Sequence, residues 1–333
     1  MTMKKNALLS GLILAFVSIS LFSNATVWRV NSAPGSAAQY VSVQAAHDAT
    51  TTLNNDTLYV EASATTQGPL SCSKKLVIIG TGYFLAQNPQ TQSTPVASTI
   101  DYIYFNAGSQ GSKVMGISTG YIYINTSNLL ITRNYISGAG YPIYGQAANL
   151  GNIVITQNYI QGSAYYSQAI YFPYAANNIL ITNNYIQGYV SSGTNFAGIF
   201  ENNVVFGYIA LYNTTLKNNI LTGSYGNFTN YNCIYTNNIS YNSDFGTANG
   251  NQANVVMSNV FAGTATTNDG YFKLKAGSPA LGAGENGVDC GMYGGPFPYI
   301  LSGMPNIPSI YYFNAPSIPS NTINVAIKAK SHN

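Results

Sequence analysis

The sequence has very little charge of either sign. Only 6% of its 333 residues are Asp, Glu, Lys or Arg, against roughly 25% in an ordinary soluble domain, and there are two His. The 12 Lys and Arg are scattered and outnumber the 9 Asp and Glu by only three, so they form no basic patch and we expect no nucleic-acid partner. The 46% apolar content argues against disorder, which accompanies low hydrophobicity and high charge.

Cysteine is also scarce. Cys72, Cys233 and Cys290 are odd in number and widely spaced, which is not the pattern of a disulfide framework. The sequence leaves one bridge possible, but it favours buried free thiols.

Beyond residue 25 the sequence lacks a long apolar run. Residues 1–25 combine Lys4 and Lys5, an apolar stretch from Ala7 to Phe22 and a small-x-small site ending at Ala25. This pattern predicts a secretory signal peptide cleaved after Ala25, because the run of about 16 residues is shorter than the roughly 20 that cross a bilayer. A membrane anchor is the alternative reading. We expect an exported protein, located outside the cell, on its surface or in a periplasm, with no membrane span after cleavage.

The abundant residues are uncharged: 40 Asn, 32 Gly and 28 Tyr. They occur in a repeat, since the segments 128–138, 152–162 and 178–188 are close copies of one another and weaker copies follow at 199–207, 215–223, 235–242 and 256–263. All copies share an asparagine: Asn134, Asn158, Asn184, Asn203, Asn219, Asn238 and Asn259. The spacing averages about 21 residues.

A period near 20 residues, with β-branched alternation and no helical periodicity, predicts a β-solenoid whose coils stack on one another. The positions three before and two after the shared asparagine are mostly apolar and are expected to point inward. The asparagine itself is expected to adopt the left-handed conformation at a bend and to form an amide ladder between coils. Cys233 falls at an inward position.

Segments on both sides of the repeats carry a family resemblance. Residues 40–49, 56–60 and 74–80 look like the opening of right-handed parallel β-helix proteins, and residues 272–284 with 287–291 look like the closing segment of exported Bacteroidetes members. The chain thus resembles the pectin-lyase-like superfamily. This resemblance implies an all-β right-handed parallel β-helix over 26–295 with a short cap helix near 44–49. The Pro-rich residues 296–333 are expected to be a capping or anchoring tail. The fold serves lyases, hydrolases, esterases and adhesins, so it does not choose a function.

The sequence offers no recognisable catalytic site. Glu201 is the only acid between Asp101 and Asp244, so no carboxylate cluster can form in the central coils, and no His lies between His47 and His332. Paired acids for glycoside hydrolysis and stacked carboxylates for calcium are both missing. We therefore expect no catalytic residues, no metal and no cofactor. An enzyme with a Tyr or Lys base, such as Lys217, is not excluded.

The remaining candidates form two columns along the coils. Tyr135, Tyr159 and Tyr185 follow the shared asparagine, and Arg133, Gln157 and Asn183 precede it. The tyrosines could stack on sugar rings, or they could stabilise the sheet or be covered by loops. The polar column could bind sugar hydroxyls or be a solvated face. The sequence favours a non-catalytic binding or adhesive protein with a polysaccharide or cell-surface partner. A divergent polysaccharide lyase or glycoside hydrolase is the alternative.

Isolated charged residues in the repeats have structural explanations. Glu201 and Lys217 occupy the same position in consecutive copies and are expected to form an ion pair. His47 is expected to lie in the cap helix beside Asp48, and Asp289 is expected to accept hydrogen bonds in a turn.

Overall fold

The structure, a computed structural model, describes residues 25–162, 167–223, 231–263, 267–315 and 324–332. All of the predicted signal peptide except Ala25 lies outside these ranges, as do Pro316 and Pro319 of the tail.

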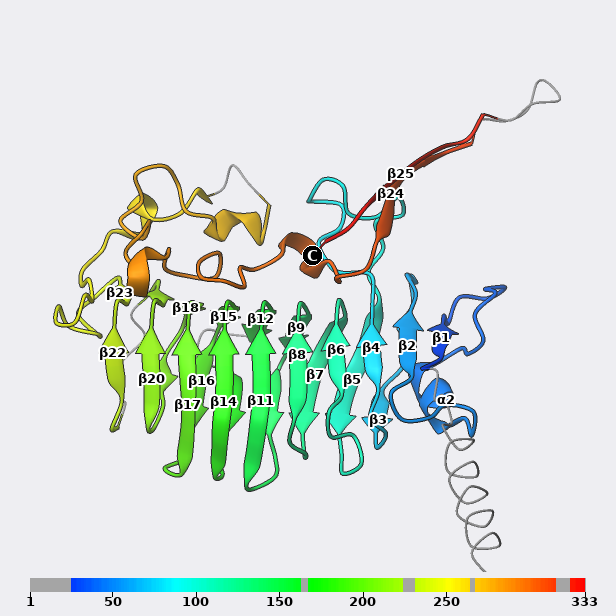
Figure 1. Cartoon of the computed structure of the whole chain (residues 1–333), viewed down its shortest axis with the longest axis horizontal. Helices are drawn as coiled ribbons and strands as arrows, with labels where there is room; N and C mark the ends of the chain where they lie inside the picture. The colour runs from blue at the N-terminus through cyan, green and yellow to red at the C-terminus, as the bar shows by residue number, and fades with distance from the viewer. Residues whose placement is uncertain (1–24, 163–166, 224–230, 264–266, 316–323, 333) are drawn as a thin grey trace, which may run out of the picture.

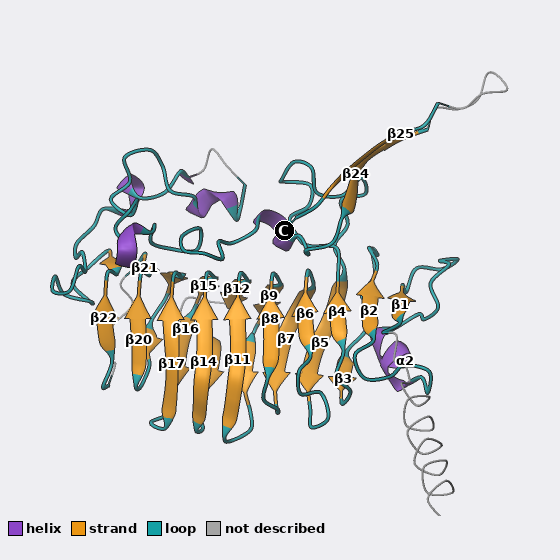
Figure 2. Cartoon of the chain, viewed as in Figure 1, coloured by secondary structure: helices purple, strands orange, loops and turns teal. Residues whose placement is uncertain are grey.

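Most of the chain winds into a solenoid of parallel strands (Figures 1 and 2), which confirms the predicted all-β class and parallel β-helix architecture. One sheet has ten strands, in the order β1 (Val27–Val30), β2 (Thr57–Val60), β4 (Val77–Ile79), β6 (Lys113–Met115), β8 (Leu129–Thr132), β11 (Leu150–Thr156), β14 (Ala176–Thr182), β17 (Phe196–Glu201), β20 (Thr214–Lys217) and β22 (Ile234–Thr236).

The second sheet has 13 strands and is forked at β7 (Ser118–Ile124). Its first branch continues through β9 (Tyr135–Gly138), β12 (Tyr159–Gly162), β15 (Tyr185–Gln187), β18 (Val204–Phe206), β21 (Ile220–Leu221) and β23 (Ile239–Ser240). Its second branch continues through β10 (Ile143–Gly145), β13 (Gln168–Phe172), β16 (Tyr189–Ser192) and β19 (Ile209–Ala210). Before the fork lie β3 (Leu70–Cys72) and β5 (Thr99–Phe105).

The predicted inward columns form the core. Ile131, Ile155, Ile181, Phe200 and Leu216 are buried, and so are Ile136, Ile160, Ile186, Val205 and Leu221. Each fully buried side chain of this kind stabilises the fold by about 1.5–3 kcal/mol. The last predicted copy is wrong: residues 257–259 form the 3-10 helix η1 (Met257–Asn259), and Val256 is 58% exposed. The chain has by then left the coils, which end at β23.

The predicted asparagine ladder is present, with two corrections. In every rung after Asn134, the ladder Oδ1 accepts from the backbone N–H and the Nδ2 of the preceding rung, as Asn184 does from Asn158 at 2.9 and 3.0 Å. The seventh rung is Asn251 rather than Asn259, since Asn251 Oδ1 accepts from Asn238. The rungs are therefore Asn134, Asn158, Asn184, Asn203, Asn219, Asn238 and Asn251.

The left-handed residue at the bend is not the ladder asparagine but the residue before it. Arg133, Gln157, Asn183, Asn202, Asn218 and Asn237 all have φ between 52° and 57°. We call these six residues the left-handed column. Their conformation turns the next residue inward, so the buried ladder amides can bond one another and nearby backbone carbonyls.

A short helix, α2 (Val43–Asp48), covers the first coil as predicted. The Ser42 hydroxyl caps its N-terminus by accepting from Ala45 N–H at 3.1 Å. At its other end, Lys74 Nζ donates to the carbonyls of His47, Ala49 and Thr52 at 2.6–3.1 Å. This cation satisfies carbonyl groups that a helix C-terminus leaves unpaired.

After β23 the chain turns back and runs along the edge of the solenoid (Figure 1). After η1 it passes through η3 (Gly270–Phe272). We call residues 283–304 the C-terminal strap; it includes η4 (Glu285–Gly287) and η5 (Leu301–Gly303). The antiparallel hairpin β24 (Ser309–Asn314) and β25 (Ala326–Lys330) then projects from the body (Figure 1).

Candidate functional site

The three tyrosines predicted as a ligand-binding column are aligned but covered. Tyr135, Tyr159 and Tyr185 are in register on adjacent strands of the first branch. Phe84 packs on Tyr135 and Tyr159 with ring centroids 5.1 and 5.2 Å apart, and Phe272 stacks on Tyr185 at 4.3 Å. Tyr159 and Tyr185 are only 8% and 5% exposed. The alternative in which other segments cover the column is therefore correct.

The predicted polar column binds the chain itself. Arg133 Nη1 donates to the Met304 carbonyl at 3.0 Å, and Gln157 Nε2 donates to the Pro298 carbonyl at 2.6 Å. Asn183 Nδ2 donates to the carbonyls of Met292 and Gly294 at 3.0 and 2.7 Å. These contacts occupy the left-handed column along the C-terminal strap, so we place the candidate ligand site elsewhere.

The isolated charges also have structural partners. Lys217 Nζ lies 3.2 Å from Glu201, as predicted, and 2.9 Å from Glu285 in the strap. The Glu285 contact is the main reason that the pKa of Lys217 is raised. Asp289 Oδ1 accepts from Gly282 N–H at 2.8 Å, which confirms its predicted turn role.

His47 lies in the cap helix, as predicted. Its Nδ1 is 2.7 Å from Asp48, and its Nε2 is 3.0 Å from the backbone N–H of Ser73. The hydrogen bond from His47 lowers the pKa of Asp48. Nδ1 is thus engaged within the cap helix, and Nε2 joins this helix to the segment after β3.

The cysteines are free thiols in the described structure. Cys72 and Cys290 are buried, as predicted, and Cys233 is half-buried. Burial raises the pKa of Cys72 to about 11 and that of Cys290 to about 12. Such thiols remain protonated near neutral pH and are poor nucleophiles.

A second array of tyrosines is accessible. It lies on the outer face of the second branch and of the strands before it. Tyr104, Tyr123, Tyr144 and Tyr171 are half-buried and occupy matching positions on β5, β7, β10 and β13. We call these four residues the tyrosine platform. Each lies beside the next across a strand pair, so the platform runs along the solenoid axis over four strands.

The rings of the platform contact one another closely. Tyr104 stacks on Tyr123 with centroids 4.5 Å apart and planes 13° from parallel, and Tyr144 stacks on Tyr171 at 5.6 Å and 7°. Tyr141, which is 39% exposed, stacks on both Tyr144 and Tyr171 at 4.9 and 5.5 Å. This mutual stacking forms a continuous aromatic strip that is partly exposed at the surface.

Amide side chains border the platform. Two residues beyond Tyr104, Tyr123 and Tyr144 in sequence come Asn106, Asn125 and Gln146, which are half-buried. Asn125 Nδ2 donates to Asn106 Oδ1 at 3.0 Å, so these amides form a short ladder of their own. An aromatic strip beside a row of amides offers both apolar contact and hydrogen bonding to one ligand.

The surroundings of the platform carry almost no charge. The strands of the second sheet contain no Lys or Arg, and Asp101 in β5 is their only acidic residue. Burial, followed by the neighbouring hydroxyls of Tyr104, Tyr121 and Tyr144, raises the pKa of Tyr123, so its hydroxyl is neutral at physiological pH. An anionic ligand would find no cation on this sheet.

The sequence contained a signal for the platform that alignment on the asparagine missed. Tyr102-Ile-Tyr104 recurs 19 residues later as Tyr121-Ile-Tyr123, and both tyrosines of each pair are in register. Tyr144 and Tyr171 lie between the segments that share the asparagine. The structure places them on β10 and β13, which are third strands of their coils, and β16 and β19 are the corresponding strands of the next two coils.

The described ranges hold no group of three His, Cys, Asp or Glu side chains able to bind a metal ion. Among the same residues, no helix is long and apolar enough to cross a membrane. Comparison with protein-family models gives no match, and comparison with curated proteins finds no significant relative.

Proposed function

We propose that this protein is an exported β-solenoid that binds an uncharged polysaccharide through the tyrosine platform. The observation that carries the proposal is the accessible row of Tyr104, Tyr123, Tyr144 and Tyr171 on a sheet without cations. Sugar rings present apolar C–H faces and hydroxyl edges, which suit aromatic rings bordered by amides. A polymer lying along the solenoid axis would contact successive coils. Membership of the pectin-lyase-like superfamily is part of this proposal.

The absence of Lys and Arg on the second sheet favours a neutral polymer over an acidic one. Binding a carboxylated or sulfated chain would bury its charges without partners, which is costly. The ligand class we propose is therefore a neutral glycan.

The environment of Thr26 supports export and cleavage after Ala25. Thr26 N lies 2.8 Å from Asp56 Oδ1, and Asp56 Oδ2 accepts from Trp28 Nε1 at 2.9 Å. Cleavage would turn this amide into an ammonium group and the contact into an ion pair. Secretion of a chain whose N-terminal residue is Thr26 would support this step, and secretion with residues 1–25 attached would contradict it.

The binding proposal is tested by retention of the chain on insoluble glycans. We expect retention on at least one neutral glycan among cellulose, chitin, starch and xylan, and none on immobilised alginate or pectate. Tyr144→Ser should abolish retention. Tyr231→Ser is the matched control, because Tyr231 forms a similar stack on Tyr212, at 4.7 Å and 16°, outside the four platform strands. The proposal would be contradicted if both variants lost retention equally or if only acidic glycans retained the chain. Release of sugar from the glycan would also contradict it.

A further inference from the structure

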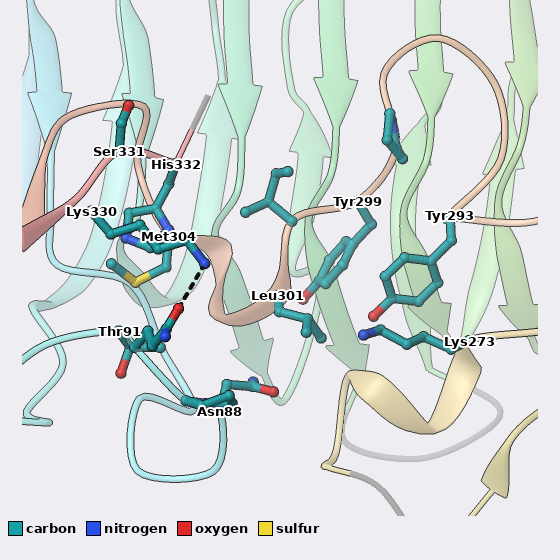
Figure 3. Close-up of a pocket in the computed structure, with 14 residues that line it drawn as sticks. Asn88, Thr91, Lys273, Tyr293, Tyr299, Leu301, Met304, Lys330, Ser331 and His332 are labelled. Atoms are coloured by element: carbon teal, nitrogen blue, oxygen red, sulfur yellow. Dashed lines mark hydrogen bonds between the residues drawn. The ribbon is translucent and has the colours of Figure 1, made fainter. Parts of the chain in front are cut away.

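A separate cavity lies where the C-terminal strap meets the end of the described chain (Figure 3). It has a volume of about 480 Å³ and is bounded by residues 88–91, 298–301 and 330–332, together with Lys273, Tyr293 and Met304. It lies outside the second sheet and shares no residue with the tyrosine platform.

Two lysines converge on this cavity. Lys273 and Lys330 extend toward each other from opposite sides (Figure 3). Lys273 Nζ lies 5.9 Å from the centroid of the Tyr293 ring, and Lys330 Nζ donates to Gln90 Oε1 at 3.1 Å. No Asp or Glu lines the cavity, and no ion pair joins either lysine to a carboxylate of the described residues.

The other charged groups next to the lining are bonded to the chain itself. Asp269 is fully buried, and its oxygens accept from the Tyr299 hydroxyl at 3.3 Å, from Asn88 Nδ2 at 2.9 Å and from the Ser302 N–H at 2.6 Å. His332 lines the cavity, and Arg133 donates to its carbonyl at 3.0 Å. Burial, then the charges of Lys330 and Arg133, lower the pKa of His332, which is consistent with an excess of positive charge at this place.

The size and lining of the cavity indicate a ligand larger than a bare ion. A water molecule occupies about 30 Å³ in the liquid, so a volume of about 480 Å³ far exceeds what a five-atom oxyanion fills. Leu301, Met304 and Pro298 supply apolar wall, and Tyr293 supplies a ring beside Lys273. Lysines act as point charges and suit a tetrahedral oxyanion approached from two sides.

We propose that this cavity binds the sulfate or phosphate monoester of a sugar, with the oxyanion between Lys273 and Lys330 and the sugar ring against the apolar wall. Sulfate and phosphate esters share this chemistry, and direct comparison of the two identifies the natural source. The site is independent of the tyrosine platform.

The test is calorimetric titration of the intact chain with glucose 6-sulfate, glucose 6-phosphate, glucose and inorganic sulfate. We expect at least one ester to bind, and glucose and inorganic sulfate each to bind about tenfold more weakly or worse. Lys273→Gln and Lys330→Gln should each weaken ester binding by about tenfold, a size typical of losing one charge-assisted contact.

Lys328→Gln is the matched control. Lys328 lies on the same strand as Lys330, but its Nζ is 5.2 Å from the Tyr312 ring and it does not line the cavity. Tyr144→Ser should also leave ester binding unchanged, which separates this site from the proposed glycan face. An affinity for inorganic sulfate equal to that for the ester would mean an adventitious ion only. An affinity for glucose equal to that for the ester would also overturn the proposal, and so would unchanged ester affinity in both Lys273→Gln and Lys330→Gln.

Discussion

At the residue scale, the buried amide of Asn184 shows what one side chain contributes to the solenoid. Its Nδ2 donates to Ile155 and Thr182 carbonyls and to the Asn203 side chain at 2.9–3.0 Å. Its Oδ1 accepts two bonds from Asn158. A truncated side chain would leave donors and acceptors unpaired in the core.

We expect Asn184→Ala to lower the free energy of unfolding by about 3 kcal/mol, because each buried group left unpaired costs about 1–3 kcal/mol. Chemical denaturation measures this change. Asn178→Gly is the control, since Asn178 is exposed, belongs to an outer pair with Asn152 and has φ 51°, which glycine tolerates. If Asn178→Gly lowered the free energy of unfolding as much as Asn184→Ala, burial of the ladder amides would not be the source of their contribution to stability.

Asp56 gives a pH-dependent prediction. Burial alone would raise its pKa, but hydrogen bonds from the Leu53 and Thr26 N–H groups and from Trp28 outweigh burial, so the pKa is lowered. A carboxyl with a lowered folded pKa stabilises the fold above its unfolded pKa of about 3.9, and this stability is lost as pH falls through the folded value.

We therefore expect Asp56→Asn to destabilise the chain by about 2 kcal/mol at pH about 7 and by less near pH about 3, where the carboxyl of the unfolded chain is mostly protonated. Urea unfolding at the two pH values measures the difference. An equal destabilisation at both would mean that the charge of Asp56 contributes nothing.

At the element scale, the strap depends on the left-handed column. Asn183→Ala removes two hydrogen bonds to the strap and places alanine at φ 55°, so we expect the strap to open more often. Cys290, buried in the strap with its Sγ 3.2 Å from the Asn237 carbonyl, reports such opening through alkylation.

We expect Asn183→Ala to accelerate alkylation of Cys290 while Cys72, buried in the first coils, stays protected. The alkylation rate of Cys290 in Asn183→Gly should lie between the rates in Asn183→Ala and in the wild type. Asn183→Gly loses the same hydrogen bonds, but glycine adopts the left-handed conformation without strain. Equal acceleration at Cys72 and Cys290 would indicate general unfolding rather than release of the strap.

Some features of these elements were predictable from the sequence and others were not. Ile131, Ile155 and Ile181 were identifiable as core because strands alternate and coils repeat. The cover over Tyr159 and Tyr185 was not predictable, because Phe84 and Phe272 come from segments that share no pattern with the repeats. The platform tyrosines lie outside the segments that share the asparagine, so the 21-residue repeat gives no signal for them. The contacts between the strap and the left-handed column depend on backbone carbonyls, which leave no residue-type signature.

At the scale of the whole molecule, buried tyrosines join the strap and residues 83–84 to the solenoid. Tyr83 and Tyr299 hydroxyls lie 2.5 Å apart, and both side chains are buried. Burial raises the pKa of each well above its usual value, and it does the same for Tyr159 and Tyr293. The folded values thus exceed the unfolded pKa of about 10.

These tyrosines contribute full stability below pH about 10, and that stability falls as pH rises further, because unfolding then releases their protons. We expect a loss of about 1.4 kcal/mol per pH unit for each such group. Exposed tyrosines ionise with the fold intact, but these four buried tyrosines should ionise only when the circular dichroism signal of the fold is lost, as a separate late step in tyrosinate absorbance. Ionisation of every tyrosine with the fold intact would contradict this account, and Tyr83→Phe should make the pH dependence of stability shallower.

The central claim, that a neutral glycan binds along the tyrosine platform, is tested most directly by titrating a soluble oligomer of the retained glycan into the chain. We predict saturable binding that is at least about tenfold weaker in Tyr144→Ser/Tyr171→Ser and unchanged in Tyr212→Ser/Tyr231→Ser, where an equally stacked pair is removed elsewhere. Unchanged affinity in the platform variant, with its fold intact by circular dichroism, would contradict the claim.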